Sequence, residues 1–115
     1  MAADTRAVMD KAFKLAQKQL GRRKSIRHEV SAELVRARRK HPHWPADPLH
    51  ALAILGEEYG ELTQAVLQHT YEPEESDLQH VREEAVQTAA MALRFLESLD
   101  EYAFQPCKQI GRGDS

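Results

Sequence analysis

The chain has 115 residues, of which 42% are hydrophobic and 30% charged, as in a globular domain of ordinary composition. Its one cysteine, Cys107, excludes an internal disulfide and a cysteine-based zinc site. No apolar run approaches the roughly 18 residues of a membrane span, and the first residues lack the apolar segment of a signal peptide. We therefore expect a single cytoplasmic domain that does not associate with membranes.

The net charge of −2 is the sum of two halves of opposite sign. Residues 1–44 hold 12 basic and 4 acidic side chains, a net of +8, and residues 45–115 hold 4 basic and 14 acidic ones, a net of −10. Three interpretations fit this asymmetry. The basic half binds nucleic acid, basic helices pack on acidic helices within or between subunits, or an anionic substrate lies between basic side chains and a metal held by acidic ones.

A first helix is predicted from Thr5 to Leu20, because Asp4 or Thr5 can cap its start and Gly21 can end it. Lysines follow one of its faces. We expect residues 1–24 to form this basic helix and a positively charged hinge after it.

A second helix is predicted from Ser25, as its cap, to Lys40. Basic side chains crowd its last turn, where cations suit the helix dipole and where they could also bind a triphosphate. On charge alone, the candidates for phosphate contact are Arg36, Arg39 and Lys40.

Three prolines exclude a helix between His41 and Pro48, so this segment is predicted to be the main loop. Trp44 lies between two of these prolines. It either packs over the end of the core or offers its flat face to a nucleobase. Nearby histidines, including His50, match no strong zinc motif.

A third helix is predicted from Pro48 to His69, since Asp47 can cap it and proline suits the first helical position. A fourth helix, from about residue 77 to 99, follows a capping box formed by Ser76 and Gln79. Residues 101–115 lack periodicity and are expected to be a flexible tail. No segment alternates like a strand, which predicts an all-α bundle of four main helices.

Two acidic groups lie on the third and fourth predicted helices. Glu58 and Glu61 are three residues apart and share one helix face with Glu57 beside them, and Glu84 follows on the next helix. Carboxylates gathered without a cation repel one another and raise their own pKa values, and a bound metal removes that penalty. Mg²⁺ prefers such oxygen ligands together with water and substrate phosphates.

The run Glu57-Glu58-Tyr59-Gly60-Glu61-Leu62, followed about twenty residues later by Glu83-Glu84-Ala85-Val86-Gln87, resembles the MazG-like all-α nucleoside triphosphate pyrophosphohydrolases. The resemblance covers residues 25–100, and the loop with Trp44, the Asp-Pro helix start and Gly60 add to it. It implies a helical bundle completed as a homodimer or homotetramer. It also implies an enzyme that uses Mg²⁺, or Mn²⁺ in its place, to split nucleoside triphosphates into monophosphate and pyrophosphate.

The resemblance also implies roles for individual residues. Glu58, Glu61 and Glu84 would bind the metal, with Gln87 at the family's fourth ligand position, and Glu57 and Glu58 would be catalytic. The expected contacts with the substrate come from charge and position and not from the resemblance: Trp44, His50, Arg36, Arg39 and Lys40.

Gln87 departs from the family pattern, which has an aspartate there. A glutamine offers a carbonyl oxygen without a charge, so the site would lose one negative charge. The alternative to catalysis is a weak or inactive MazG-like protein that binds nucleotide or acts as a structural dimer. A third class, a nucleic-acid module, depends on the basic half alone, and the acidic half would repel a phosphate backbone.

Overall fold

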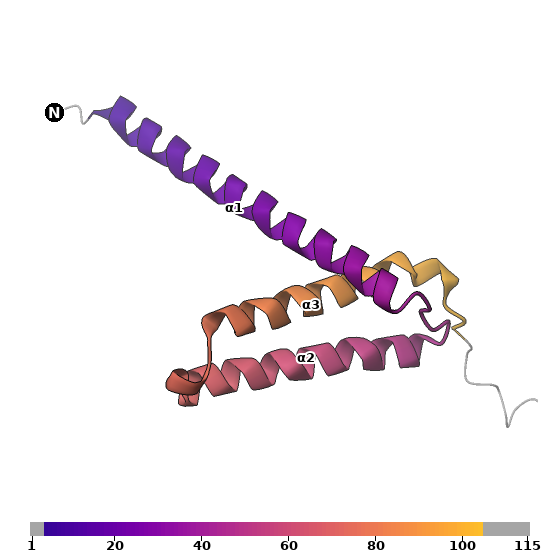
Figure 1. The fold of residues 1–115 in the computed structure, drawn as a ribbon. Helices are drawn as coiled ribbons and strands as arrows, with labels where there is room; N and C mark the ends of the chain where they lie inside the picture. The colour runs from indigo at the N-terminus through magenta and orange to yellow at the C-terminus, as the bar shows by residue number, and fades with distance from the viewer. Residues whose placement is uncertain (1–3, 105–115) are drawn as a thin grey trace, which may run out of the picture.

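The computed structural model describes residues 4–104, and within that range the chain is all-α, with no strand. Three long helices and two short 3₁₀ turns follow one another (Figure 1): α1 Thr5–Lys40, α2 Pro48–Tyr71, η1 Pro73–Glu75, α3 Leu78–Glu97 and η2 Leu99–Glu101. Residues 1–3 and most of the predicted tail, 105–115 with Cys107, lie outside the described residues.

The prediction of four main helices is wrong in the N-terminal part, where α1 runs unbroken for 36 residues. Gly21, expected to end a helix, and Ser25, expected to start one, are both inside it. A glycine in a helix interior costs about 1 kcal/mol relative to alanine, which the strong helix formers on either side offset. Gly21 also lacks the positive φ of a helix-ending glycine.

Two predicted helix starts are confirmed. The Asp4 carboxylate accepts a hydrogen bond from the backbone N–H of Ala7 at 3.2 Å, at the start of α1. Asp47 accepts one from Leu49 at 3.0 Å, with Pro48 at the first position of α2.

The start of α3 differs from the predicted capping box. Asp77, and not Ser76, caps this helix by accepting a hydrogen bond from the backbone N–H of Gln79 at 2.9 Å. Ser76 instead places its hydroxyl 2.7 Å from Nδ1 of His69, at the end of α2. That contact fixes the turn between the two helices.

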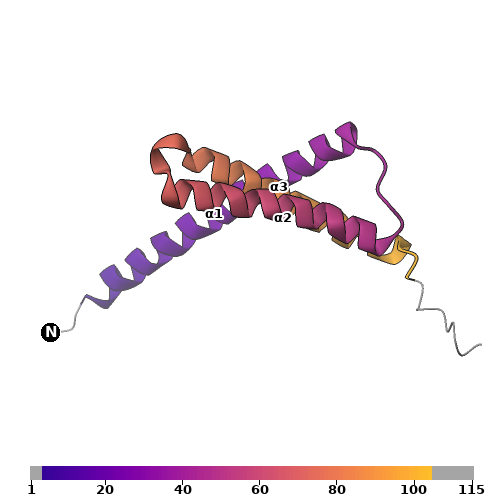
Figure 2. The same ribbon diagram turned by 90° about the horizontal axis from the view of Figure 1, so that it is seen from below.

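Helices α2 and α3 lie side by side and antiparallel, and we call residues 48–97 the hairpin (Figure 1). Small residues occupy its most buried positions, where Ala51, Ala65 and Ala90 are at most 3% exposed. Their short side chains let helix backbones approach closely. Helix α1 crosses the hairpin obliquely (Figure 2) and packs on α3.

The contact between α1 and α3 involves the C-terminal part of α1. Val30 and Leu34 join Ala90 and Met91 in the main core cluster. Two ion pairs between exposed side chains flank it, Arg82 with Glu29 and Arg38 with Glu97. These contacts hold the end of α1 across α3.

Residues 5–28 of α1, which we call the arm, are exposed throughout and project away from the hairpin (Figures 1 and 2). The molecule measures 81 × 40 × 29 Å, with a radius of gyration of 21.7 Å. A compact domain of this length has a radius of gyration of about 13 Å. Among residues 4–104, no helix has both the length and the apolarity to cross a membrane.

Residues 102–104, expected to belong to the flexible tail, are packed against the rest of the chain. Tyr102 is 8% exposed, and its ring lies beside Phe95. The backbone N–H of Ala103 donates a hydrogen bond to the carbonyl oxygen of Ala46 at 2.9 Å. The loop after α1 and the segment after α3 are thereby joined at one end of the molecule.

Candidate metal centre and adjoining cavity

Three of the predicted metal ligands lie together. Glu58 and Glu61 on α2 and Glu84 on α3 each offer a carboxylate oxygen, and the three oxygens lie within 4.8 Å of one another. Glu58 and Glu84 are half-buried between the helices, whereas Glu61 is exposed. The two facing helices thus turn their carboxylates toward one point.

The environment of these carboxylates disfavours their charged forms. Burial raises the pKa of Glu58 above its ordinary value, and the neighbouring carboxylates of Glu61 and Glu84 raise it further. Burial and Glu61 also raise the pKa of Glu84, while nearby His80 acts in the opposite direction. The charged cluster is therefore strained electrostatically, and a cation bound there would relieve the strain.

Two oxygens of the cluster have lost their contact with water without gaining a partner. Oε2 of Glu58 and Oε2 of Glu84 are buried and form no hydrogen bond with the residues that the structure describes. The other oxygen of Glu84 lies 3.9 Å from Nε2 of His80. A buried carboxylate oxygen without a hydrogen-bond partner lowers the stability of the fold. Such an oxygen is a suitable ligand for a hard cation such as Mg²⁺.

A hydrogen bond joins the two helices at the level of the cluster. The hydroxyl oxygen of Thr88 lies 2.8 Å from the carbonyl oxygen of Glu84 and 3.2 Å from that of Glu58. The Thr88 hydroxyl proton is therefore shared between the backbone carbonyl oxygens of Glu58 on α2 and Glu84 on α3. This contact fixes the separation of α2 and α3 where the acidic side chains meet.

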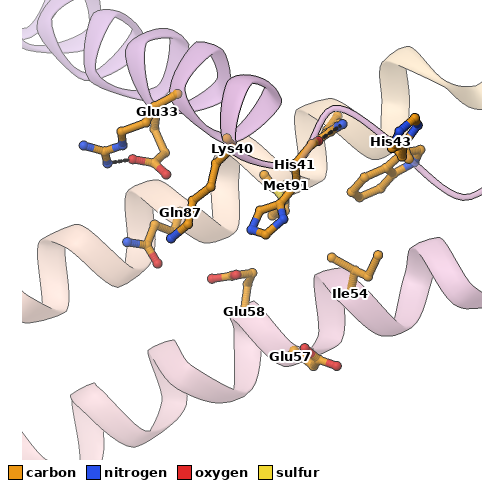
Figure 3. A pocket seen from close by; sticks show the side chains of 13 residues that line it. Glu33, Lys40, His41, His43, Ile54, Glu57, Glu58, Gln87 and Met91 are labelled. Carbon is orange, nitrogen blue, oxygen red and sulfur yellow. Dashed lines mark hydrogen bonds and ion pairs between the residues drawn. The ribbon is translucent and has the colours of Figure 1, made fainter.

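A cavity of about 590 Å³ adjoins the cluster on the side covered by α1 (Figure 3). Glu58 is the member of the cluster that lines it, and Gln87 lies opposite on α3. Arg36 and Lys40 reach it from the last turns of α1. The cavity lining therefore holds acidic groups from α2 and basic groups from α1, where Glu33 is ion-paired with Arg36.

Trp44 lines the cavity and also packs against the core. Its indole N–H donates a hydrogen bond to the hydroxyl oxygen of Tyr102 at 2.8 Å, and that hydroxyl donates to the carbonyl oxygen of Phe95 at 3.1 Å. The guanidinium of Arg94 lies 4.8 Å from the centre of the indole ring. One face of the ring is thus covered and Trp44 packs against the core, while contact with a nucleobase stays a prediction.

The other predicted site residues differ in position. Arg36 lines the cavity but is ion-paired with Glu33, one turn before it on α1. Glu57 is exposed at the cavity margin. Arg39 and His50 are exposed and do not line the cavity, so the structure does not bring them to the site.

Sequence reasoning missed Arg94, which is 5% exposed and donates a hydrogen bond to the carbonyl oxygen of His41 at 2.7 Å. It also missed the place of His41, whose ring points into the cavity toward Glu58 (Figure 3). A basic residue within the apolar stripe of α3 was the one signal available for Arg94. Tyr102 was missed because it follows the last helical pattern.

A scan against models of protein families, a search of curated proteins and a search of solved structures each found no match to this chain.

Proposed function

We propose that this protein is a Mg²⁺-dependent nucleoside triphosphate pyrophosphohydrolase that releases nucleoside monophosphate and pyrophosphate. The observation that carries the proposal is the convergence of Glu58, Glu61 and Glu84 within 4.8 Å, from two helices. Two oxygens of this set are buried without a partner, which supports a bound cation over a solvated acidic surface. The resemblance to the MazG-like family, carried by the same residues, supports the reaction class.

The donor set fits a hard dication. Glu58, Glu61 and Glu84 would hold Mg²⁺ or Mn²⁺, and the amide oxygen of Gln87, which lines the adjoining cavity, is a candidate for a neutral ligand. When bound, such a metal neutralises phosphate charge and orients water for hydrolysis.

The cavity supplies the substrate side of the proposal. Its volume of about 590 Å³ lies in the range of small-molecule sites. Arg36 and Lys40 would face the negative triphosphate, and the exposed face of Trp44 would lie against the base. In the reaction, the oxygen of a water forms a new bond to phosphorus and a phosphoanhydride bond breaks. Glu57, at the cavity margin, can accept the proton that the attacking water releases.

The alternative is a protein that binds nucleotide without turnover. Gln87 favours this alternative, because a neutral side chain lines the cavity where the family's pattern has a fourth carboxylate. With one negative charge fewer, the site would have a lower affinity for a second divalent cation.

We also propose that the chain assembles as a homodimer or a dimer of dimers through α2. The outward face of this helix is free of charge and exposes large side chains, with Leu52 at 52%, Tyr59 at 64% and Val66 at 43%. Gly56 and Gly60 lie on the same side with open space above them. An uncharged apolar face of this kind is typical of a surface buried between subunits.

Turnover of a panel of nucleoside triphosphates with Mg²⁺ or Mn²⁺, followed by release of pyrophosphate, tests the proposal. We expect activity in the wild type and a loss of at least 100-fold in Glu61→Gln. Glu75→Gln, which removes an exposed carboxylate from η1, is the matched control and should retain activity.

The same assay separates the two alternatives. An inactive wild type that still binds nucleotide would support the binding protein. Activity gained in Gln87→Asp would then show that the missing carboxylate is the cause. Turnover that is independent of divalent ions would contradict the assigned site.

A further inference from the structure

The arm is an amphipathic helix whose residues are all exposed among the residues that the structure describes. Large apolar side chains occupy one side of it, with Met9 65%, Phe13 63% and Leu20 51% exposed. The opposite side carries Lys11, Lys14, Lys18 and Arg22, spaced three or four residues apart. A solvated helix has no physical need for the apolar side, so this side indicates a partner surface.

The apolar side of the arm lies near the side of α1 that packs on α3, with Arg23 and Arg27 between the two. Met9 and Val30 are separated by 21 residues, and Leu20 and Leu34 by 14, which are whole multiples of seven. Seven residues are close to two helical turns, so these pairs lie near the same side of α1. Val30 and Leu34 are buried against α3, and the arm presents the same kind of surface beyond the end of that contact.

The arm cannot reach its own hairpin, because α1 has no break between Thr5 and Lys40. At about 1.5 Å per residue the arm extends about 36 Å from the point where α1 leaves α3. No surface within the described residues 29–104 therefore covers the arm, and we look for its partner in another molecule.

The opposite charges of the arm and the hairpin indicate which molecule covers the arm. Residues 5–28 hold eight basic and one acidic side chain, a net of +7, whereas the hairpin holds ten acidic and two basic ones, a net of −8. The hairpin also exposes apolar side chains on α3, with Leu78 65% and Leu96 61% exposed. We propose that the arm packs on the hairpin of a second copy of this chain, apolar side to apolar surface and basic flank to acidic flank.

The charge of the hairpin argues against the other occupants. An anionic membrane or a nucleic acid would attract the arm but repel the hairpin attached to it. The inference depends on neither the metal nor the hydrolysis, so failure of the turnover assay would leave it untouched.

Sedimentation equilibrium of the full chain tests the inference with a pair of matched double variants. Phe13→Glu with Leu20→Glu places two charges on the apolar side of the arm. Ala7→Glu with Ser25→Glu makes the same change of charge on the opposite side. We expect the first pair to weaken self-association at least 10-fold and the second less than 3-fold. A monomeric wild type, or equal effects of the two pairs, would overturn the proposal.

Cross-linking identifies the surface that the arm contacts. In a mixture of ¹⁵N-labelled and unlabelled chains, a zero-length carboxyl–amine cross-linker should join Lys11, Lys14 or Lys18 of one copy to hairpin carboxylates of the other. Peptide pairs of mixed isotope show that the contact is intermolecular, and their absence would overturn the proposal. Binding to phosphatidylserine vesicles that is lost in the Phe13→Glu, Leu20→Glu variant, with self-association unchanged, would overturn it in favour of a membrane.

Discussion

Glu58 is the residue at which the cluster, the cavity and the contact between helices meet. Its carboxylate belongs to the acidic cluster and lines the cavity, and its backbone carbonyl oxygen lies 3.2 Å from the hydroxyl of Thr88. The backbone that carries this side chain is therefore held to α3 by a hydrogen bond. Such positioning is what a metal ligand requires, because the scaffold then fixes the geometry of the site.

The raised pKa values of Glu58 and Glu84 predict how stability depends on pH without metal. Both groups bind a proton more tightly in the folded chain than in the unfolded chain, whose value is near 4.5. Their stabilising contribution is complete below that pH and is lost as the pH rises through the raised values. In the presence of a chelator, Glu58→Gln should therefore reduce the fall in unfolding free energy above pH 4.5. Urea denaturation at a series of pH values measures this, and a slope equal to that of Glu75→Gln would contradict it.

Arg94 is a buried cation whose partners are a backbone carbonyl and an aromatic ring. Replacement by methionine keeps much of the volume but leaves the carbonyl oxygen of His41 without its donor and Trp44 without its cation. We expect Arg94→Met to lower the unfolding free energy by about 1–3 kcal/mol, in the range found for a buried hydrogen bond to a charged group. Arg39→Met, at an exposed position on α1, is the control for urea denaturation and should change little. Equal stability of the two variants would show that the hydrogen bond of Arg94 to His41 contributes no net stability.

At the scale of elements, capping residues and proline made α2 predictable to within two residues, from the cap at Asp47 onward. Glu58 and Glu61 were predictable as neighbours because residues three apart share a helix face, whereas the approach of Glu84 depended on the assumption that two helices pack side by side. The prediction that a helix ends at Gly21 was wrong because one glycine costs less free energy than the helix-forming residues on both sides contribute. The positions of Arg39 and Arg94 depend on how α1 crosses α3, which no local pattern contains.

The continuity of α1 gives a prediction at Gly21. This glycine has nothing within 4 Å of the position that a Cβ would take, and its backbone has ordinary helical φ. Gly21→Ala should therefore stabilise the helix locally by about 0.5–1 kcal/mol. Hydrogen exchange of the neighbouring amides should slow accordingly. Faster exchange, or reduced helix content by circular dichroism, would indicate a bend that the glycine is needed to form.

At the scale of the whole molecule, a metal that binds the folded chain alone stabilises it. The gain is RT ln(1 + [L]/Kd), roughly 2.7 kcal/mol at a hundredfold excess over Kd. We expect Mg²⁺ or Mn²⁺ to raise the Tm of the wild type in a calorimetric scan. Glu61→Gln should reduce that rise and Glu75→Gln should preserve it. The same rise in Tm in the wild type and both variants would show that the ions bind at a site other than the acidic cluster.

Self-association through α2 makes a prediction about its glycines. In a single copy, Gly56 and Gly60 have open space where a Cβ would stand, so alanine at both would favour the helix. If a second α2 packs closely on this face, the added methyl groups would instead hold the two helices apart. Gly56→Ala with Gly60→Ala should therefore weaken dimerisation in sedimentation equilibrium while helix content is kept or increased. Unchanged dimerisation would place the subunit interface elsewhere.

The unbroken α1 has one more consequence. Arg36 and Lys40 border the cavity on the same continuous helix that carries Phe13 and Leu20 in the arm. A continuous helix moves as one body. A partner bound to the arm would therefore also set the orientation of Arg36 and Lys40 toward a ligand in the cavity. Assembly and catalysis would then be mechanically linked, and the affinity for a triphosphate should rise with protein concentration as the subunits engage.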